Sequence, residues 1–356
     1  MLKQGMITQE EHDQAVEAPL NFQKKQHAER LSVTQSYFVD HVIEEVIDGL
    51  MDKFDYERAE AARDLYGSGY HIYATVDERI QTILEDYYVD VDNFPKVLVG
   101  GKEYPQSAAV ILDPHSGEIK GLVGGRGEKR SARTFNRATM GKRSPGSTFK
   151  PIGPYALAFE YDRLYWSTVI EDSPINPDEP EHEWYPRNYY EEYLGSVDVA
   201  YAIARSVNTV AVKVGQLVTP QSIYDFLYND LEIHSLVETD IDIAPMALGS
   251  TTYGVTPLEL AGAFQMFANG GYYITPHAFT HVLDSDGKIV LEANATPRRV
   301  LSEDTAVLMN KLLQGVVTGA GGTAHTAQIP GMPTAGKTGT SDKNLDQWFV
   351  GFTPYY

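Results

Sequence analysis

The sequence has no cysteine among its 356 residues. This absence excludes thiol catalysis, disulfide bonds and cysteine-ligated zinc, while it leaves the redox compartment open. No stretch reaches the roughly 20 apolar residues that a membrane-spanning helix needs, and residues 1–23 lack the apolar core of a signal peptide. We therefore expect this chain to be soluble by itself and to make no membrane contact of its own.

Positive charge is scarce as well. The 29 lysines and arginines stand against 49 aspartates and glutamates, which gives a formal net charge of −20 at pH 7. Nucleic acids and anionic lipids both need a basic surface, so neither is an expected partner. The ten histidines are scattered, and His182-Glu183 lacks the second histidine of a zinc-binding helix. We expect neither a metal nor a cofactor.

What is present is an ordinary globular composition, with 42% apolar and 22% charged residues. Two apolar runs joined by a turn, residues 108–112 and 119–123, predict a β-hairpin covered on both faces. Apolar spacing and capping residues predict helices over 36–54, from 78 onward, and over 147–161, 196–204, 208–218, 256–269 and 304–317. Strands are expected over 70–76, 280–291 (a hairpin), 336–340 and 347–353. The whole pattern predicts an α+β fold in which an antiparallel sheet is flanked by helices.

Three short motifs occur in a fixed order along the chain. They are Ser147-Thr148-Phe149-Lys150, Ser206-Val207-Asn208 and Lys337-Thr338-Gly339-Thr340. Together they supply a serine nucleophile, two lysines, a second hydroxyl and an amide, which is the inventory of an acyl-transfer site without histidine. Any one of the motifs alone would carry little weight.

The first motif predicts a nucleophile and its base. At the start of a helix, Lys150 lies on the same face as Ser147, about 5–6 Å away between Cβ atoms. A lysine accepts a proton only when it is neutral, and its ordinary pKa is about 10.4. Burial would lower that pKa, and a second cation such as Lys337 would lower it further.

The other two motifs predict assisting groups. Ser206 and Asn208 lie near a junction between two helices, where a hydroxyl can relay a proton and an amide can hold a carbonyl; both residue types are also common helix caps. On a strand, Lys337 and Gly339 share one face. We expect the glycine to leave room for a substrate backbone, and the Thr340 N–H to join that of the nucleophile in polarising a carbonyl.

Two other patterns compete with this interpretation. Ser285-Asp286-Gly287-Lys288 also has the Ser-x-x-Lys spacing, but its Asp-Gly pair predicts a hairpin turn. Residues 331–338 satisfy the Walker A pattern, yet they lack the preceding strand and following helix that a phosphate loop needs. We regard both as chance matches.

With its motifs placed, the chain resembles the class A penicillin-binding proteins, which build bacterial peptidoglycan. The likeness is specific from about residue 68 to the end and covers the earlier part of the chain more loosely. The segments that carry it are Arg143-Ser144-Pro145-Gly146, Trp184-Tyr185-Pro186-Arg187-Asn188-Tyr189, Ala247-Leu248-Gly249-Ser250 and Trp348-Phe349-Val350-Gly351-Phe352.

This resemblance implies a penicillin-binding, serine β-lactamase-like fold and peptidoglycan DD-transpeptidase activity. Ser147 would be acylated by the D-Ala-D-Ala end of a stem peptide, an amine of a neighbouring stem peptide would resolve the acyl-enzyme, and β-lactams would trap the serine. Lys150 would be the general base, and Ser206 with Asn208 would assist proton transfer. In the third motif, Lys337, Thr338 and Thr340 would bind the terminal carboxylate. Lys337 would also count among the catalytic residues, and Gly339 among the substrate-binding ones.

The resemblance also implies a domain division and a location. Residues 1–20 would be the last helix of a glycosyltransferase domain, 21–105 a linker region, and 106–356 a transpeptidase domain that stops before the family's last strand. We therefore expect no glycan polymerisation by this chain. Its partners would be stem peptides, β-lactam antibiotics and cell-wall synthesis proteins at the extracytoplasmic face of the bacterial membrane. Pro154 departs from a regular helix and should kink it.

Alternatives remain open at this point. A DD-carboxypeptidase or β-lactamase on the same fold would use water in place of the amine, although a β-lactamase would be expected to have aspartate where this chain has Val207. An inactive fragment could bind β-lactams without turnover. A nucleotide hydrolase built on residues 331–338 is the weakest alternative.

Overall fold

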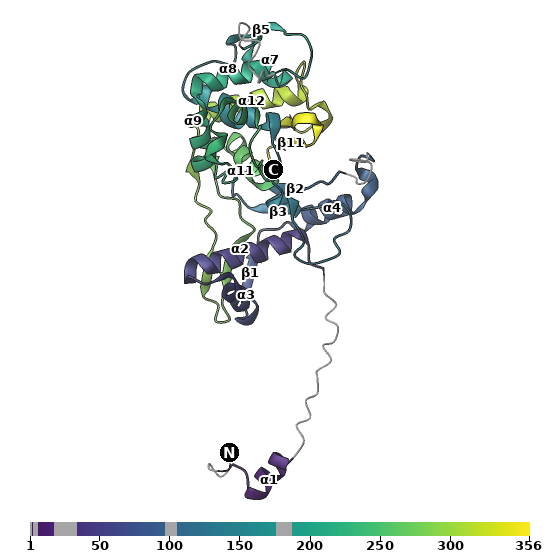
Figure 1. Cartoon of the computed structure of the whole chain (residues 1–356), viewed down its shortest axis with the longest axis vertical. Coiled ribbons are helices and arrows are strands. Elements are labelled where there is room, and N and C mark those ends of the chain that lie inside the picture. Colours follow the sequence, from purple (N-terminus) through teal and green to yellow (C-terminus); the bar gives the residue numbers. More distant parts are fainter. Residues whose placement is uncertain (1, 3–5, 18–33, 97–104, 176–186) are drawn as a thin grey trace. The chain divides into compact units, whose positions relative to one another are not determined.

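The computed structural model describes residues 2, 6–17, 34–96, 105–175 and 187–356 (Figure 1). They fall into two units, residues 1–34 and 35–356. The first unit holds α1 (Gln9–Glu17), which opens with a capping box: Thr8 N–H donates to Glu11 Oε2 at 2.8 Å, and Glu11 N–H donates to Thr8 Oγ1 at 3.3 Å. Residues 21–33, the first part of the expected linker region, lie outside the described residues.

The second unit begins with a hydrophobic cluster around α2 (Tyr37–Phe54). The helix was predicted over 36–54, and Ser36 caps it by accepting from Val39 N–H at 3.1 Å. The cluster also contains α3 (Arg58–Gly67) and an antiparallel sheet in the order β1 (His71–Ala74), β7 (Phe279–Leu283), β8 (Ile289–Glu292). The sequence predicted a boundary after residue 105, between a linker region and a transpeptidase domain. This sheet pairs β1 from the first region with β7 and β8 from the second, so the two regions share one hydrophobic core.

The predicted hairpin at residue 108 is present, as β2 (Ala109–Leu112) and β3 (Ile119–Val123). Helix α4 (Glu78–Val89), capped by Asp77 as predicted, packs on β3. Gln81 of α4 fixes this contact, donating to Leu122 O at 3.0 Å and accepting from Leu122 N–H at 2.8 Å. β3 is almost wholly buried, whereas β2 is mostly half-buried. The expectation of cover on both faces therefore holds for β3 and was wrong for β2.

A larger hydrophobic cluster holds the helices of the second unit together, with Phe149, Tyr155, Val210 and Leu313 fully buried in it. The elements that follow β3 in chain order are α5 (Arg137–Met140), η3 (Gly146–Thr148), η4 (Pro151–Tyr155), α6 (Ala156–Glu160), β4 (Val169–Asp172), β5 (Gly195–Asp198), α7 (Val199–Arg205), α8 (Asn208–Val218), α9 (Pro220–Asp225), α10 (Ile243–Leu248), α11 (Pro257–Ala268), β6 (Tyr272–Tyr273), β9 (Arg298–Arg299), α12 (Glu303–Thr318), β10 (Ala335–Thr340) and β11 (Gln347–Phe352).

Two predicted helices differ from the structure. Residues 147–161 do not form one α-helix: η3 is a 3-10 turn, η4 is a π-helical turn that contains Pro154, and only then does α6 begin. The proline has no N–H for the α-helical hydrogen bond, so the widened turn is the predicted irregularity. α7 begins at Val199 rather than near Ser196, because Ser196 lies in β5 and Asp198 is the cap, accepting from Tyr201 N–H at 2.7 Å.

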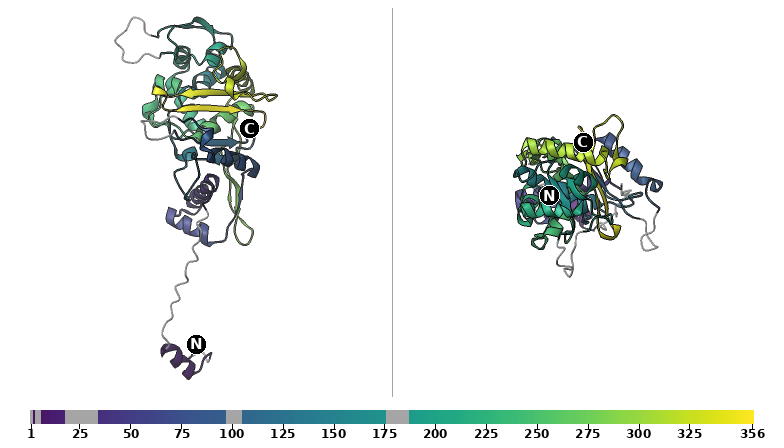
Figure 2. Two further views of the ribbon diagram at one scale, coloured as in Figure 1. Left: turned by 90° about the vertical axis from the view of Figure 1, so that its right-hand side faces the viewer. Right: turned by 90° about the horizontal axis from the view of Figure 1, so that it is seen from above.

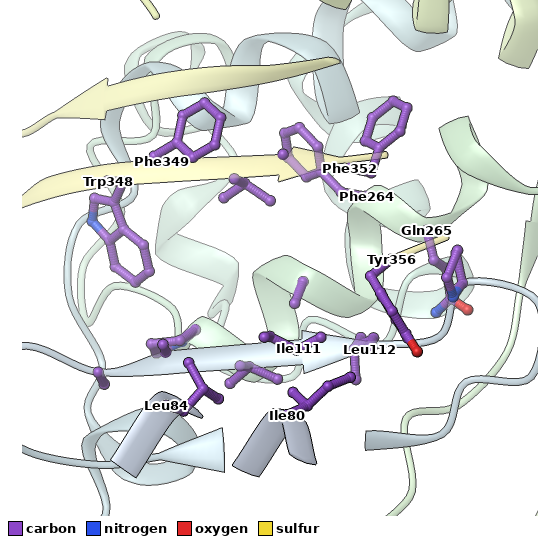
Figure 3. A pocket seen from close by; sticks show the side chains of 18 of the residues that line it. Ile80, Leu84, Ile111, Leu112, Phe264, Gln265, Trp348, Phe349, Phe352 and Tyr356 are labelled. Atoms are coloured by element: carbon purple, nitrogen blue, oxygen red, sulfur yellow. The ribbon is translucent and has the colours of Figure 1, made fainter. Parts of the chain in front are cut away.

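The strand pairs are antiparallel, which confirms the α+β prediction, but they are divided among several small sheets. Figure 2 shows β10 and β11 side by side in front of the helices, and α12 packs against β10. An apolar groove of about 580 Å³ lies between β11 and β2, with α4 and α11 lining it as well (Figure 3). In the described ranges, no helix has the length and apolarity that crossing a bilayer requires.

Candidate active site

Residues 144–148, which we call the nucleophile segment, form the turn that carries Ser147, and neighbouring elements contact this turn from both sides. Ser144 Oγ donates to Gly249 O at 2.8 Å, and the indole Nε1 of Trp348 donates to Ser144 O at 2.9 Å. Gly146 has φ of 53°, a conformation that strongly favours glycine, and a Cβ built on it would lie 2.5 Å from Thr340 O. The backbone of β10 therefore passes directly beside Ser147, as the three motifs predicted.

Ser147 itself is half-buried in η3. Within the part of the chain that the structure describes, no hydrogen bond of its hydroxyl is found. Lys150 therefore makes no hydrogen bond to Ser147 and is held by the second motif. A serine hydroxyl without a hydrogen-bond partner among the described residues is available to a substrate.

Lys150 is 1% exposed, and its Nζ is held by the second motif. It donates to Ser206 O at 2.7 Å and to Asn208 Oδ1 at 2.5 Å, and it lies 3.2 Å from Ser206 Oγ. Burial lowers the pKa of Lys150 well below its ordinary value, and the nearby Lys337 adds to this effect. These conditions favour the neutral amine that a lysine base requires.

Ser206 lies at the junction of α7 and α8, as predicted, and caps α7 in the left-handed conformation at φ 60° and ψ 43°. Its Oγ lies between the two lysines, because Lys337 Nζ donates to it at 2.8 Å. Lys337 is fully buried and also donates to Thr338 O at 2.9 Å. Burial lowers the pKa of Lys337 to about 7. One hydroxyl thus connects both amines, which is the geometry of a proton relay.

Strand β10 alternates as predicted. Lys337 and Gly339 are buried, whereas Thr338 is half-buried and Thr340 is exposed. The hydroxyls of Thr338 and Thr340 therefore lie on the less buried side of the strand, where they can meet a ligand. The Thr338 hydroxyl also lies 2.7 Å from that of Thr323, a residue outside the three motifs.

The structure shows a packing reason for glycine at position 339 that the sequence analysis did not predict. A Cβ built on this residue would lie 2.4 Å from Pro145 O and 2.7 Å from a Thr148 side-chain carbon. The missing side chain therefore makes room for the nucleophile segment itself, while the expectation that it also leaves room for a substrate backbone stays a prediction. Close packing of β10 on the turn that carries Ser147 requires glycine here.

We predict that Gly339→Ala destabilises the protein by roughly 1–3 kcal/mol, because the added methyl group overpacks this contact. Thermal or denaturant unfolding measures the effect. Gly315→Ala is the matched control: Gly315 lies within α12, nothing lies within 4 Å of its built Cβ, and alanine should stabilise that helix slightly. Equal stability of both variants would contradict the packing role of Gly339.

The two competing patterns, the second Ser-x-x-Lys sequence and the Walker-like stretch, lie in the structural settings that the sequence predicted for them. Ser285 and Lys288 are exposed in the turn between β7 and β8. The Walker-like stretch runs into strand β10, where a phosphate loop would have a helix. Trp184, Tyr185 and Pro186, which contributed to the resemblance, lie outside the described residues.

Sequence reasoning assigned no individual role to Trp348, Asn188 and Asp172, of which the first two contact segments of the site and the third holds Asn188. Trp348 holds the nucleophile segment, Asn188 donates to Asp172 at 2.8 Å, and Asn188 Oδ1 accepts from Asn208 N–H at 2.8 Å. Asp172 is 1% exposed. A lone aspartate at the end of a strand carries no signal that would have marked it in advance.

Comparison with known proteins agrees with the motifs. Residues 107–356 match the family described as the penicillin binding protein transpeptidase domain. Penicillin-binding protein 1A of Clostridium botulinum is 33% identical, and penicillin-binding protein 1A/1B of Bacillus subtilis is 30% identical; each alignment covers 100% of this chain. The chain spans only 44% and 38% of the lengths of these two relatives.

Solved structures show the same fold. The penicillin-binding protein PonA1 of Mycobacterium tuberculosis superposes with a TM-score of 0.69 at 21% identity, over 89% of this chain and 81% of that one. Penicillin-binding protein 1A of Haemophilus influenzae gives 0.67 at 21% identity, over 99% of this chain and 68% of that one. The family match spans more than half of the chain and contains all three motifs. The chain therefore belongs to the penicillin-binding protein transpeptidase family.

Proposed function

We propose that this chain is a serine-type peptidoglycan DD-transpeptidase that β-lactams acylate. The observation that carries the proposal is the buried relay in which Ser206 Oγ lies 3.2 Å from Lys150 Nζ and 2.8 Å from Lys337 Nζ. Lys150 follows Ser147 by three residues, and the Ser147 hydroxyl has no hydrogen bond to the described residues. The chain spans less than half the length of its first relatives, so the proposal concerns only the chemistry of this site.

The reaction follows from the positions of these groups. Ser147 Oγ attacks the carbonyl carbon between the two terminal D-alanines, and its proton passes to the neutral Lys150 amine. The backbone N–H groups of Ser147 and Thr340 polarise the carbonyl oxygen. As the peptide bond breaks, Ser206 gives its hydroxyl proton to the leaving D-alanine nitrogen and takes in its place the proton that Lys150 received from Ser147. An amine of a second stem peptide then attacks the ester, its proton returns by the same path, and Ser147 is released.

The third motif would bind the terminal carboxylate of the substrate. The Thr338 and Thr340 side chains reach the less buried side of β10 and can donate to it directly. The buried Lys337 supplies positive charge from beneath. We place this reaction at the extracytoplasmic face of the bacterial membrane, because that is where peptidoglycan stem peptides are cross-linked.

One experiment separates this function from its rivals. Intact-mass measurement after incubation with benzylpenicillin should show a single stable adduct, and digestion should map it to the peptide that contains Ser147. A stem peptide ending in D-Ala-D-Ala should release D-alanine and, when an acceptor amine is present, form a cross-linked product. Rapid penicillin turnover would favour a β-lactamase, release without cross-linking a carboxypeptidase, and an adduct without release an inactive binder. No adduct at all would refute the proposal.

A further inference from the structure

The carboxylate of Asp172 accepts four hydrogen bonds at the end of β4, away from the reacting groups. Oδ1 accepts from Asn188 Nδ2 at 2.8 Å and from the Thr209 hydroxyl, and Oδ2 accepts from Tyr190 OH at 3.0 Å and from Leu194 N–H at 2.9 Å. Burial raises its pKa, but these bonds outweigh it and lower the pKa overall. Asp172 therefore stays ionised and anchors the strap, which we define as residues 187–194.

The anchor fixes the orientation of the Asn188 amide. Because its nitrogen donates to Asp172, its oxygen points the other way and accepts from Asn208 N–H at 2.8 Å. Helix α8 itself offers no acceptor for that N–H, because the N–H groups of a first helical turn have no partner within the helix. The cap position of α8 holds Val207, which supplies no side-chain hydrogen bond. The strap therefore provides the cap that the helix sequence lacks.

The strap fixes the Asn208 amide in the same way. Asn208 Nδ2 donates to Arg187 O at 2.5 Å, so Asn208 Oδ1 must face Lys150 Nζ, which donates to it at 2.5 Å. With its amide reversed, Asn208 would present a donor to the Lys150 amine and leave it without this acceptor. The orientation that Lys150 needs thus depends on a backbone carbonyl of the strap.

We propose that Asp172 and Asn188 are positioning residues that hold the strap so that the Asn208 amide keeps its oxygen on Lys150. The proposal rests on the proposed function of the site, since it explains how the base is oriented for proton transfer. Neither residue contacts the substrate. Their effect passes through Asn208, and this dependence separates a positioning role from a purely structural one.

The test compares Asp172→Asn and Asn188→Ala with the exposed neighbour Glu171→Gln as control. We expect each of the first two to slow acylation at saturating benzylpenicillin about 10- to 100-fold, less than the loss of the base itself. The penicillin concentration for half-maximal rate should change little. Asn188→Ala should add nothing to Asn208→Ala, because both remove the same link. Full additivity, or wild-type acylation rates in both variants, would overturn the proposal.

A second readout does not depend on acylation. By NMR, the side-chain N–H groups of Asn208 should exchange slowly in the wild type and in Glu171→Gln, and rapidly in Asn188→Ala. If the wild type forms no adduct, the proposed function fails while this measurement still decides the positioning role. If the adduct forms but Asn208 exchanges equally in all variants, only the positioning role fails. Should Asp172→Asn not fold, the half-buried Asn188 still provides the comparison.

Discussion

Ser147→Ala should abolish covalent labelling by benzylpenicillin and leave the fold unchanged. Labelling requires the oxygen of Ser147, because that atom forms the ester bond when the lactam ring opens. The fold should not depend on this atom: the side chain is half-buried, and its hydroxyl has no hydrogen bond to the described residues. Intact mass spectrometry measures the adduct, and circular dichroism with thermal unfolding checks the fold.

The second Ser-x-x-Lys sequence offers a matched control. Ser285 has the same spacing to a lysine but is exposed in a hairpin turn, far along the chain from the other motifs. Ser285→Ala should therefore label as fast as the wild type. An adduct that persisted in Ser147→Ala, or that disappeared in Ser285→Ala, would show that another residue is the nucleophile.

Lys150→Met should slow acylation by on the order of 10²–10⁴, the usual loss when a general base is removed. Methionine has a similar length and suits a buried position, so the surrounding core should remain packed. It cannot accept the proton of Ser147, and it leaves Ser206 O and Asn208 Oδ1 without their donor. Stopped-flow or gel-based labelling gives the rate constant. Lys288→Met, at the exposed lysine of the hairpin turn, should change nothing.

The pH dependence provides a further check on Lys150. The base acts when it is deprotonated, so the rate is full above its pKa and falls as the pH drops through that value. Burial and Lys337 lower the pKa of Lys150 well below 10.5, so acylation should already be substantial at neutral pH. An ordinary lysine would confine the reaction to alkaline solution. A wild-type rate that rose only near pH 10, or a Lys150→Met rate equal to the wild type, would exclude this lysine as the base.

Local sequence was enough to predict most of the elements. Asp77 caps its helix as expected, and Ser36 and Thr256 cap the helices that were expected to begin there, since a side-chain oxygen before an apolar repeat satisfies N–H groups that the helix leaves open. Predictions failed where a nearby element competed for the same residues. Ser196 is drawn into β5 by pairing with β4, and no local pattern reveals a partner 25 residues away in the chain.

The members of the candidate site were predictable for a similar reason. The residue types of the three motifs, which are serine, lysine, asparagine and threonine, indicate by their chemistry and spacing an acyl-transfer site. The fixed order of the motifs made a chance match improbable. The bonds between them were not predictable. The sequence placed Lys150 on the same face as Ser147, but it did not reveal that Ser206 and Asn208 hold the lysine amine.

By itself, the sequence determined which groups are available: a nucleophile, two lysines, a relay hydroxyl and a strand that contains glycine. Only the tertiary structure decided which group meets which, because hydrogen-bond direction and burial depend on segments far apart in the chain. Gly339 shows this plainly, since only the folded structure reveals that its small size lets β10 pack against the turn at Pro145. The lowered pKa of Lys150 is another such outcome, because desolvation exists only once the core has closed around the amine.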